Sequence, residues 1–198
     1  MQYSHIQNIR SEFGLKDKDT SKPDRTKECL QEALKKLSEG LYSKKTHFLL
    51  ELIQNAEDNE YSKEPRLKIK LLKKDPTGTC QSDGAILIQN NEKGFTEENM
   101  DALCALGKTT KTKISGYIGE KGIGFKSVFV ITTSPYIFSK GYYVRFPEKI
   151  KHLDLGYIIP EWVEEIPKIV DTSQTNIILP LDKADKMDFK SISNMMRE

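Results

Sequence analysis

The sequence predicts an α/β (α+β) two-layer sandwich, in which one mixed β-sheet carries helices on one face. The chain has 198 residues, a length that suits one domain burying its own core. Several segments place apolar residues at helical spacing, and shorter segments alternate apolar and polar residues as strands do. Two of the strand segments flank a short turn, so we expect part of the sheet to be antiparallel.

The composition excludes several other classes of protein. Hydrophobic residues make up 37% and charged residues 30%, but periodic apolar segments argue against a disordered chain. No apolar stretch approaches the ~20 residues of a membrane-spanning helix, and the first residues form no secretory signal. Three widely spaced cysteines are typical of reduced thiols, so we expect a cytoplasmic protein, with a nuclear location also compatible. The net charge of +2 does not indicate nucleic-acid binding.

The N-terminal part of the chain is interpreted as an arm followed by two helices. Residues 1–23 are polar and unperiodic and form the expected arm, so the domain is assigned to residues 24–198. Residues 26–38 have helical spacing after a capping aspartate and before a glycine. A second helix is predicted over residues 45–61, because its apolar side chains form one arc and Pro65 lies beyond its end.

Two strands and a third helix are predicted next. Residues 66–71 alternate like a half-buried strand, and residues 85–89 form an apolar strand after a turn-rich stretch. Thr96 is the candidate N-cap of a helix over residues 100–106, preceded by two glutamates that suit a first helical turn. Asn99, however, occupies the position where a capping box usually has Glu or Gln.

The C-terminal half is predicted to contain two helices and three short strands. A loop over residues 107–117 leads to a helix at residues 122–131. Strands are predicted where β-branched and aromatic residues cluster, at residues 136–138, 142–146 and 175–179. Residues 147–174 show no clear pattern, and a polar helix is predicted at residues 186–197. The chain stops in that helix, and we expect it to be the N-terminal part of a longer protein.

Three polar residues lie along the edge of the apolar arc of the second helix. Glu51, Asn55 and Asp58 are spaced i, i+4 and i+7, which places them within about 60° of one another. Taken alone, such a row is typical of any amphipathic helix, so its meaning depends on the rest of the chain.

Two further segments carry glycines that suit an anionic ligand. The predicted strand at residues 85–89 runs into residues 90–95, Asn-Asn-Glu-Lys-Gly-Phe. Farther on, Gly119-x-x-Gly122-x-Gly124 opens a helix and offers backbone N–H groups to an anion. Five lysines lie around these glycines: Lys108, Lys111, Lys113, Lys121 and Lys126. A solvated loop explains each lysine by itself, but lysines threaded with glycines favour a polyanion site.

The order of these motifs resembles the GHKL superfamily, whose members share the Bergerat ATP-binding fold. The resemblance covers about residues 24–181 and rests on the row Glu51, Asn55 and Asp58, the Asn-x-x-x-Gly-Phe-Thr segment, the Gly-x-x-Gly-x-Gly loop and Thr175. The longer segment Gly-Tyr-Ile-Gly-Glu-Lys-Gly-Ile-Gly-Phe-Lys-Ser-Val-Phe resembles the NO VEIN-like and sacsin-like ATPase domains more narrowly.

The resemblance implies that ATP and Mg²⁺ bind to this domain. Glu51 would orient and activate the attacking water, and Asn55 would hold Mg²⁺ through its amide oxygen. Gly94 would let the base lie against the backbone, and Thr175 would bond to the adenine region through water. The residues expected to contact the nucleotide are Asn55, Asp58, Asn90, Gly94, Phe95, Lys108, Gly119, Lys121, Gly122, Ile123, Gly124, Phe125 and Thr175. Residues 97–118 would form a lid, with one or more of its lysines on the phosphates.

One segment departs from the pattern of the superfamily. Its members usually have Asp-x-Gly-x-Gly, and the aspartate accepts a hydrogen bond from the adenine amino group. Here Asn90 takes the place of the aspartate, and Glu92 takes that of the first glycine. An amide oxygen can still accept this bond, but without charge assistance the bond is weaker by about 1 kcal/mol. We therefore expect lower ATP affinity or a looser choice of base.

The function implied is a Mg²⁺-dependent ATP-binding domain with slow hydrolysis that switches the conformation of a larger protein. In the superfamily, a basic residue of the following domain, lid closure or nucleotide-dependent dimerisation completes the site. The expected partners are therefore adenine nucleotide, the downstream domains of the same polypeptide and a second copy of the chain. A non-hydrolysing nucleotide-sensing or scaffold module of the same fold stays open as an alternative.

Three other functions fit the sequence less well. Residues 102–109 match a permissive phosphate-loop pattern, but the segment before them is predicted as helix where that loop needs a strand. His5, His47 and His152 lie in no phospho-acceptor helix, which argues against a histidine kinase. Aromatic residues are not interleaved with a basic face, as a nucleic-acid-binding surface would require.

Overall fold

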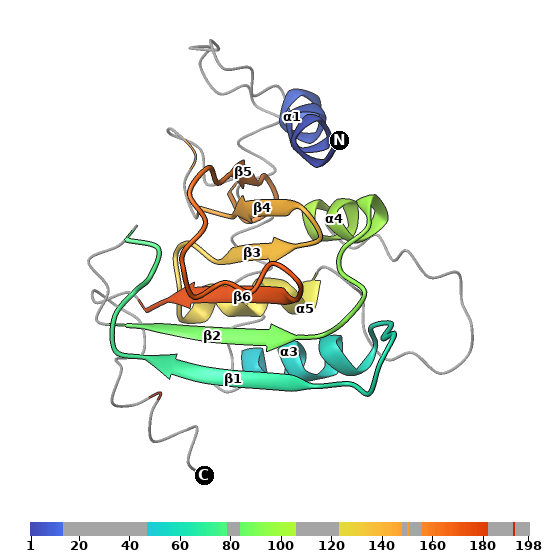
Figure 1. Cartoon of the computed structure of the whole chain (residues 1–198). Coiled ribbons are helices and arrows are strands. Elements are labelled where there is room, and N and C mark those ends of the chain that lie inside the picture. The colour runs from blue at the N-terminus through green and yellow to red at the C-terminus, as the bar shows by residue number, and fades with distance from the viewer. Residues whose placement is uncertain are drawn as a thin grey trace.

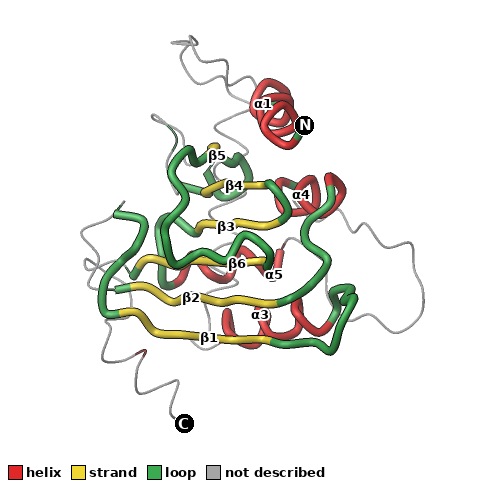
Figure 2. The backbone as a smooth tube through the Cα atoms, in the orientation of Figure 1, coloured by secondary structure: helices red, strands yellow, loops and turns green. Residues whose placement is uncertain are grey.

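The computed structural model describes residues 1–13, 47–78, 84–105, 123–147, 150, 156–181 and 192. In this part of the chain, six strands form one sheet and four α-helices and one 3-10 helix pack with it (Figures 1 and 2). The helix predicted at residues 26–38 lies outside the described residues. The one predicted at residues 186–197 also lies outside them except for Ile192, whose side chain is buried.

The described elements follow most of the predicted segments closely. The helices are α1 Gln2–Glu12, α3 His47–Glu57, α4 Glu97–Cys104, α5 Ile123–Lys126 and the 3-10 helix η1 Ser127–Val130. The strands are β1 Leu67–Leu72, β2 Ala85–Asn90, β3 Tyr136–Ser139, β4 Tyr142–Arg145, β5 Glu161–Trp162 and β6 Thr175–Pro180. None of the helices in the described ranges is long and apolar enough to cross a membrane.

The sheet has the strand order β1-β2-β6-β3-β4-β5, and all its described pairings are antiparallel. The expectation of a mixed sheet was therefore wrong for these strands. Each strand pattern was recognised correctly, but alternation along one strand carries no information about the direction of its neighbour. Direction is set by β6, which enters between β2 and β3 and runs antiparallel to both.

Helices cover one face of this sheet, as the sequence predicted. The apolar sides of all four described α-helices contribute to one apolar cluster. Strand residues such as Ile86, Ile137 and Leu179 complete it. A second cluster on the opposite face contains strand residues, among them Leu87 and Phe138, with partly buried side chains from the segment after β5. Figure 1 shows α3 and α5 behind the strands and α1 above α4 near β4.

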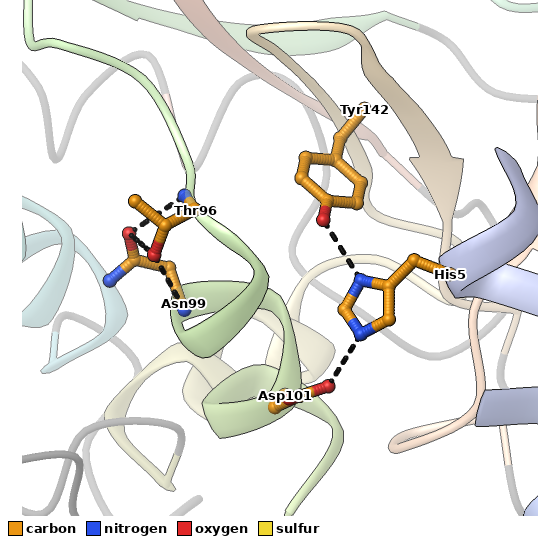
Figure 3. A network of polar contacts seen from close by, with 5 residues as sticks. All are labelled: His5, Thr96, Asn99, Asp101 and Tyr142. Atoms are coloured by element: carbon orange, nitrogen blue, oxygen red, sulfur yellow. Dashed lines mark hydrogen bonds and ion pairs between the residues drawn. The ribbon is translucent and has the colours of Figure 1, made fainter. Parts of the chain in front are cut away.

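The first residues form a docked helix and not the unperiodic arm that the sequence predicted. Ile6 and Ile9 of α1 are buried in the main cluster. His5 lies between two elements: its Nδ1 is 2.8 Å from the Tyr142 hydroxyl of β4, and its Nε2 is 2.9 Å from Asp101 Oδ1 of α4 (Figure 3). Arg10 also donates to the Pro160 carbonyl at 2.9 Å. Helix α1 is therefore held to α4 and to the β4–β5 edge of the sheet.

Candidate functional site

A pocket lies between the sheet and the helices. Its walls come from α3, the end of β2 and the segment that follows, α4, α5 and the start of β6. The cavity itself is about 80 Å³ and opens to solvent. It is smaller than the roughly 300–1,000 Å³ that is usual for small-molecule sites, so a ligand of nucleotide size would also occupy the open space in front of it.

Helix α3 lines the pocket with one face. Leu52, Asn55 and Ala56 of α3, and Asn59 two residues beyond its end, are spaced i, i+3, i+4 and i+7, and all four residues line the pocket. The sequence analysis named Asn55 but missed Asn59, which the same helical periodicity could have identified. Asp58 lies one residue beyond the end of α3, and it is not among the lining residues.

Glu51 of α3 packs against Gly124 of α5, and neither residue is among those that line the pocket. A Cβ atom built on Gly124 would collide with the Glu51 carboxylate, so a larger residue here would force the end of the Glu51 side chain to move. Glu51 is also 3.4 Å from His47 Nε2, one helical turn earlier in α3, and its side chain is 25% exposed. The carboxylate is thus held between α3 and α5 and still reaches solvent.

Asn90 carries a buried oxygen atom without a hydrogen-bond partner in the described part of the chain. The residue is 7% exposed, lines the pocket and ends β2, where Thr175 is its neighbour across the β2–β6 pair. Leaving a buried acceptor unsatisfied costs about 1–3 kcal/mol. A ligand that donates a hydrogen bond to Asn90 Oδ1 would recover this cost, so the atom fits the role that the sequence predicted.

Two hydroxyl groups connect the segment after β2 to β3 and β6. The Phe95 N–H donates to Ser139 Oγ at 3.0 Å, and Ser139 Oγ lies 2.5 Å from Thr175 Oγ1. Thr175 and Phe95 line the pocket, and Thr175 is 3% exposed. The sequence predicted both as contact residues, and the structure brings them to the same wall.

Gly94 is required by the β3–β4 turn. Its φ is +86°, and a Cβ atom there would lie 2.6 Å from the Cβ of Lys140. Gly94 is not among the lining residues of the pocket. The structure therefore explains this glycine by its packing on the turn, whereas the resemblance implied contact with a base.

Helix α4 forms another wall with Asn99, Ala102 and Leu103. Its first turn is fixed by a capping box: the Asn99 N–H donates to Thr96 Oγ1 at 3.3 Å, and the Thr96 N–H donates to Asn99 Oδ1 at 3.0 Å (Figure 3). We expected asparagine to be a poor substitute for Glu or Gln at this position. The shorter amide completes the box, so this expectation was wrong, and the sequence analysis also missed Asn99 as a lining residue.

The pocket rim carries one buried carboxylate. Glu92 is 9% exposed and lines the pocket, and a β-bridge pairs it with Tyr61. The Tyr61 hydroxyl donates to the Ala56 carbonyl of α3 at 2.6 Å. Burial, and next the negative charge of Glu92, raise the pKa of Tyr61. Glu92 thus adds a buried carboxyl group to the pocket wall next to Tyr61.

Several predicted residues cannot be assigned to the pocket. Lys108, Lys111, Lys113, Gly119, Lys121 and Gly122 lie outside the described residues. Ile123 begins α5, and Phe125 of the same helix is 4% exposed and lines the pocket. In the described ranges, no group of three His, Cys, Asp or Glu side chains could form a metal cage.

Together, the fold and the pocket define an α+β domain with a partly apolar, partly polar pocket between its sheet and its helices. A protein-family model described as Sacsin domain matches residues 27–174, which is most of the chain. The chain belongs to the sacsin domain family. The predicted resemblance to NO VEIN-like and sacsin-like domains is thereby confirmed.

Two known proteins, each much longer than this chain, contain a segment similar to it. The chain is 44% identical over 157 residues to Protein NO VEIN of Arabidopsis thaliana, covering 76% of this chain and 5% of that protein. It is 33% identical over 137 residues to Sacsin of Homo sapiens, covering 66% of this chain and 3% of that protein. The matched part is therefore a small fraction of each relative.

Proposed function

We propose that this domain binds ATP with Mg²⁺, hydrolyses it slowly and acts as a nucleotide-driven conformational switch for a larger protein. The observation that carries the proposal is the buried, unpaired Asn90 Oδ1 beside Thr175 in the pocket. The amino group of adenine is a hydrogen-bond donor that fits such an acceptor. The motif order that resembles the GHKL superfamily supports the same ligand.

Asn55 is the proposed metal ligand. Its amide lines the pocket one helical turn beyond Glu51, and an amide oxygen is a ligand that Mg²⁺ accepts. A cage of protein carboxylates is not needed, because Mg²⁺ commonly uses one or two protein oxygens with substrate phosphates and water. When bound, the ion neutralises phosphate charge, while Asn55 fixes its position relative to α3.

Glu51 is the proposed general base. Its carboxylate is partly exposed and touches Gly124 of the glycine-rich segment, where the phosphates are expected. From this place it can accept a hydrogen bond and then a proton from a water molecule. The absence of a side chain at Gly124 lets α5 pack this close to the carboxylate.

A non-hydrolysing nucleotide sensor of the same fold is the second candidate. The contacts of Glu51 with His47 and Gly124 favour it, because they give the carboxylate a structural role that needs no reaction. The two functions share the pocket and differ only in what Glu51 does.

Substitution Glu51→Ala separates the two functions. If Glu51 is the base, the variant binds ATP about as tightly as the wild type, and its phosphate release falls to the background rate. Glu57→Ala is the matched control, because it removes an exposed carboxylate from the same helix. If Glu51→Ala leaves phosphate release unchanged, the nucleotide sensor replaces the ATPase as the proposed function.

A further inference from the structure

Lys126 is buried in the core next to the pocket, but its side chain does not line the pocket. It is the last residue of α5 and 6% exposed, and its Nζ donates a hydrogen bond to the Leu103 carbonyl of α4. The rings of Phe146 and Phe125 lie 5.3 and 6.0 Å from Nζ. Burial makes the ammonium form costly and lowers the pKa of Lys126 to about 8. Apolar packing alone would be served better by leucine or methionine.

The position of Leu103 explains what the lysine contributes to α4. Leu103 lies in the last turn of the helix, where carbonyl oxygens have no partner within the helix. Ala105, the C-cap residue, has φ −89° and ψ 158°, so the chain leaves α4 in an extended conformation without a left-handed cap. Lys126 supplies the missing donor, and its positive charge lies at the negative end of the helix dipole.

The two helices joined by this hydrogen bond are two walls of the pocket. Leu103 lines the pocket from α4, and Phe125, the neighbour of Lys126, lines it from α5. Gly124, one residue earlier, contacts Glu51. A change in the separation of α4 and α5 would therefore change both the width of the pocket and the surroundings of Glu51.

We propose that Lys126 is a positioning residue, whose buried amino group holds α4 against α5 and so sets the shape of the pocket for nucleotide. This inference rests on the proposed function. It assigns a role to a buried charged group that neither the expected metal site nor the expected base uses.

The test compares Lys126→Met with the wild type in two measurements. Methionine keeps the stem in the core and removes the amino group, and replacing a buried charge by an apolar side chain of similar volume is usually tolerated. Hydrogen exchange of the nucleotide-free proteins reports on α4 directly, and calorimetry with ATP and Mg²⁺ reports on the pocket. Lys168→Met, at an exposed position beyond β5, is the matched control.

We expect the α4 amides of Lys126→Met to exchange about tenfold faster, with β2 and β6 unchanged. The ATP affinity should fall by about tenfold, which corresponds to about 1.4 kcal/mol. Lys168→Met should match the wild type in both measurements. Lys126→Arg, which keeps a donor and a charge, should recover most of the affinity, whereas a purely space-filling role predicts no such recovery.

Unchanged α4 exchange in Lys126→Met, or unchanged ATP affinity in a wild type that does bind ATP, would overturn the role of Lys126 alone. A wild type that binds no ATP would overturn the proposed function and this role with it. Exchange of wild-type α4 with and without ATP gives a second test that needs no variant. ATP should slow it, and unaltered exchange despite binding would contradict a nucleotide-facing α4 wall.

Discussion

Asn90 can either accept or donate a hydrogen bond in the pocket, whereas an aspartate at this position could only accept one. The Asn90 side chain can present its oxygen as an acceptor or, after rotation, its nitrogen as a donor. Adenine presents an amino group where guanine presents a carbonyl oxygen, so either orientation of the amide finds a partner. An aspartate at this place would accept from adenine and repel guanine.

We therefore predict that the wild type prefers ATP over GTP by less than about 100-fold, or under about 2.8 kcal/mol. Asn90→Asp should widen this ratio, because the charged acceptor strengthens the bond to adenine and penalises guanine. Titration of both nucleotides into both proteins measures the ratio. Asn8→Asp, on the exposed side of α1, is the control for the added charge. If the wild type already rejects GTP and Asn90→Asp changes nothing, Asn90 does not face the base.

The pH dependence of stability is a second prediction for a single residue. Burial lowers the pKa of Lys126 to about 8, whereas an unfolded lysine titrates near 10.4. Between these values the unfolded state binds more protons than the folded state, so the free energy of unfolding rises with pH. Below pH 8 both states are protonated, and the contribution is constant.

Urea unfolding of the wild type and Lys126→Met at pH 7 and pH 9 measures this effect. The wild type should gain about 1 kcal/mol relative to the variant between the two pH values. Burial raises the pKa of the Cys104 thiol to about 12, so this thiol also makes stability depend on pH, but both proteins contain it and its contribution cancels in their difference. If the difference in the free energy of unfolding between the wild type and the variant stays constant or falls with pH, burial does not lower the pKa of Lys126.

The sequence predicted the polar side chains of the pocket through their motifs and missed those that only the fold brings there. Asn55, Asn90 and Thr175 belong to ordered motifs, and the resemblance implied that they lie near one another. Asn59 and Asn99 reach the pocket because the segments that carry them pack around the same space, and Lys126 acts on the pocket wall through a backbone carbonyl of another helix. Such contacts depend on the distance between elements, which the sequence does not state.

At the scale of elements, α1 is the largest addition to the predicted fold. Its apolar contribution to the core consists of Ile6 and Ile9, one turn apart, which is too short a pattern to show helical periodicity. Its other anchors are polar, including the contacts of His5 with β4 and α4 (Figure 3). A helix attached in this way resembles a polar arm in its sequence.

Ile6→Ala distinguishes a docked helix from an arm. Ile6 is fully buried, and removing a buried isoleucine side chain to alanine typically costs 2–5 kcal/mol, so we expect a loss of about 2 kcal/mol or more in the free energy of unfolding. Asn8→Ala, exposed on the same helix, should change it by less than about 0.5 kcal/mol. Chemical denaturation measures both. Equal stability of the two variants would contradict the docking of α1.

The positions of most strands were predicted correctly, because each strand shows its own pattern. The order and direction of the strands in the sheet were not predicted. β5 has only two residues and lies in the stretch 147–174, where no pattern was visible. The antiparallel direction of the sheet follows from the insertion of β6 between β2 and β3, which are distant in sequence. Local propensity cannot encode such a pairing.

At the scale of the whole molecule, the pocket is lined by segments that lie far apart in the sequence. Its walls come from α3, α4, α5 and the ends of two strands, so one ligand would touch nearly every layer of the fold. A ligand that binds one arrangement of these elements better than another shifts the balance between them. This is the physical basis of the proposed switch, whose output would lie in the remainder of a longer protein.

Calorimetric titration of ATP into the 198-residue chain, with and without Mg²⁺, tests the central claim most directly. The account predicts saturable binding below about 1 mM that Mg²⁺ strengthens. Asn55→Ala should lose the Mg²⁺-dependent part of the affinity, because it removes the proposed metal ligand. Gln54→Ala, at an exposed position on the same helix, should keep it. Absence of binding heat at millimolar ATP with Mg²⁺ would contradict the proposed function, and equal affinity of both variants would contradict the metal site.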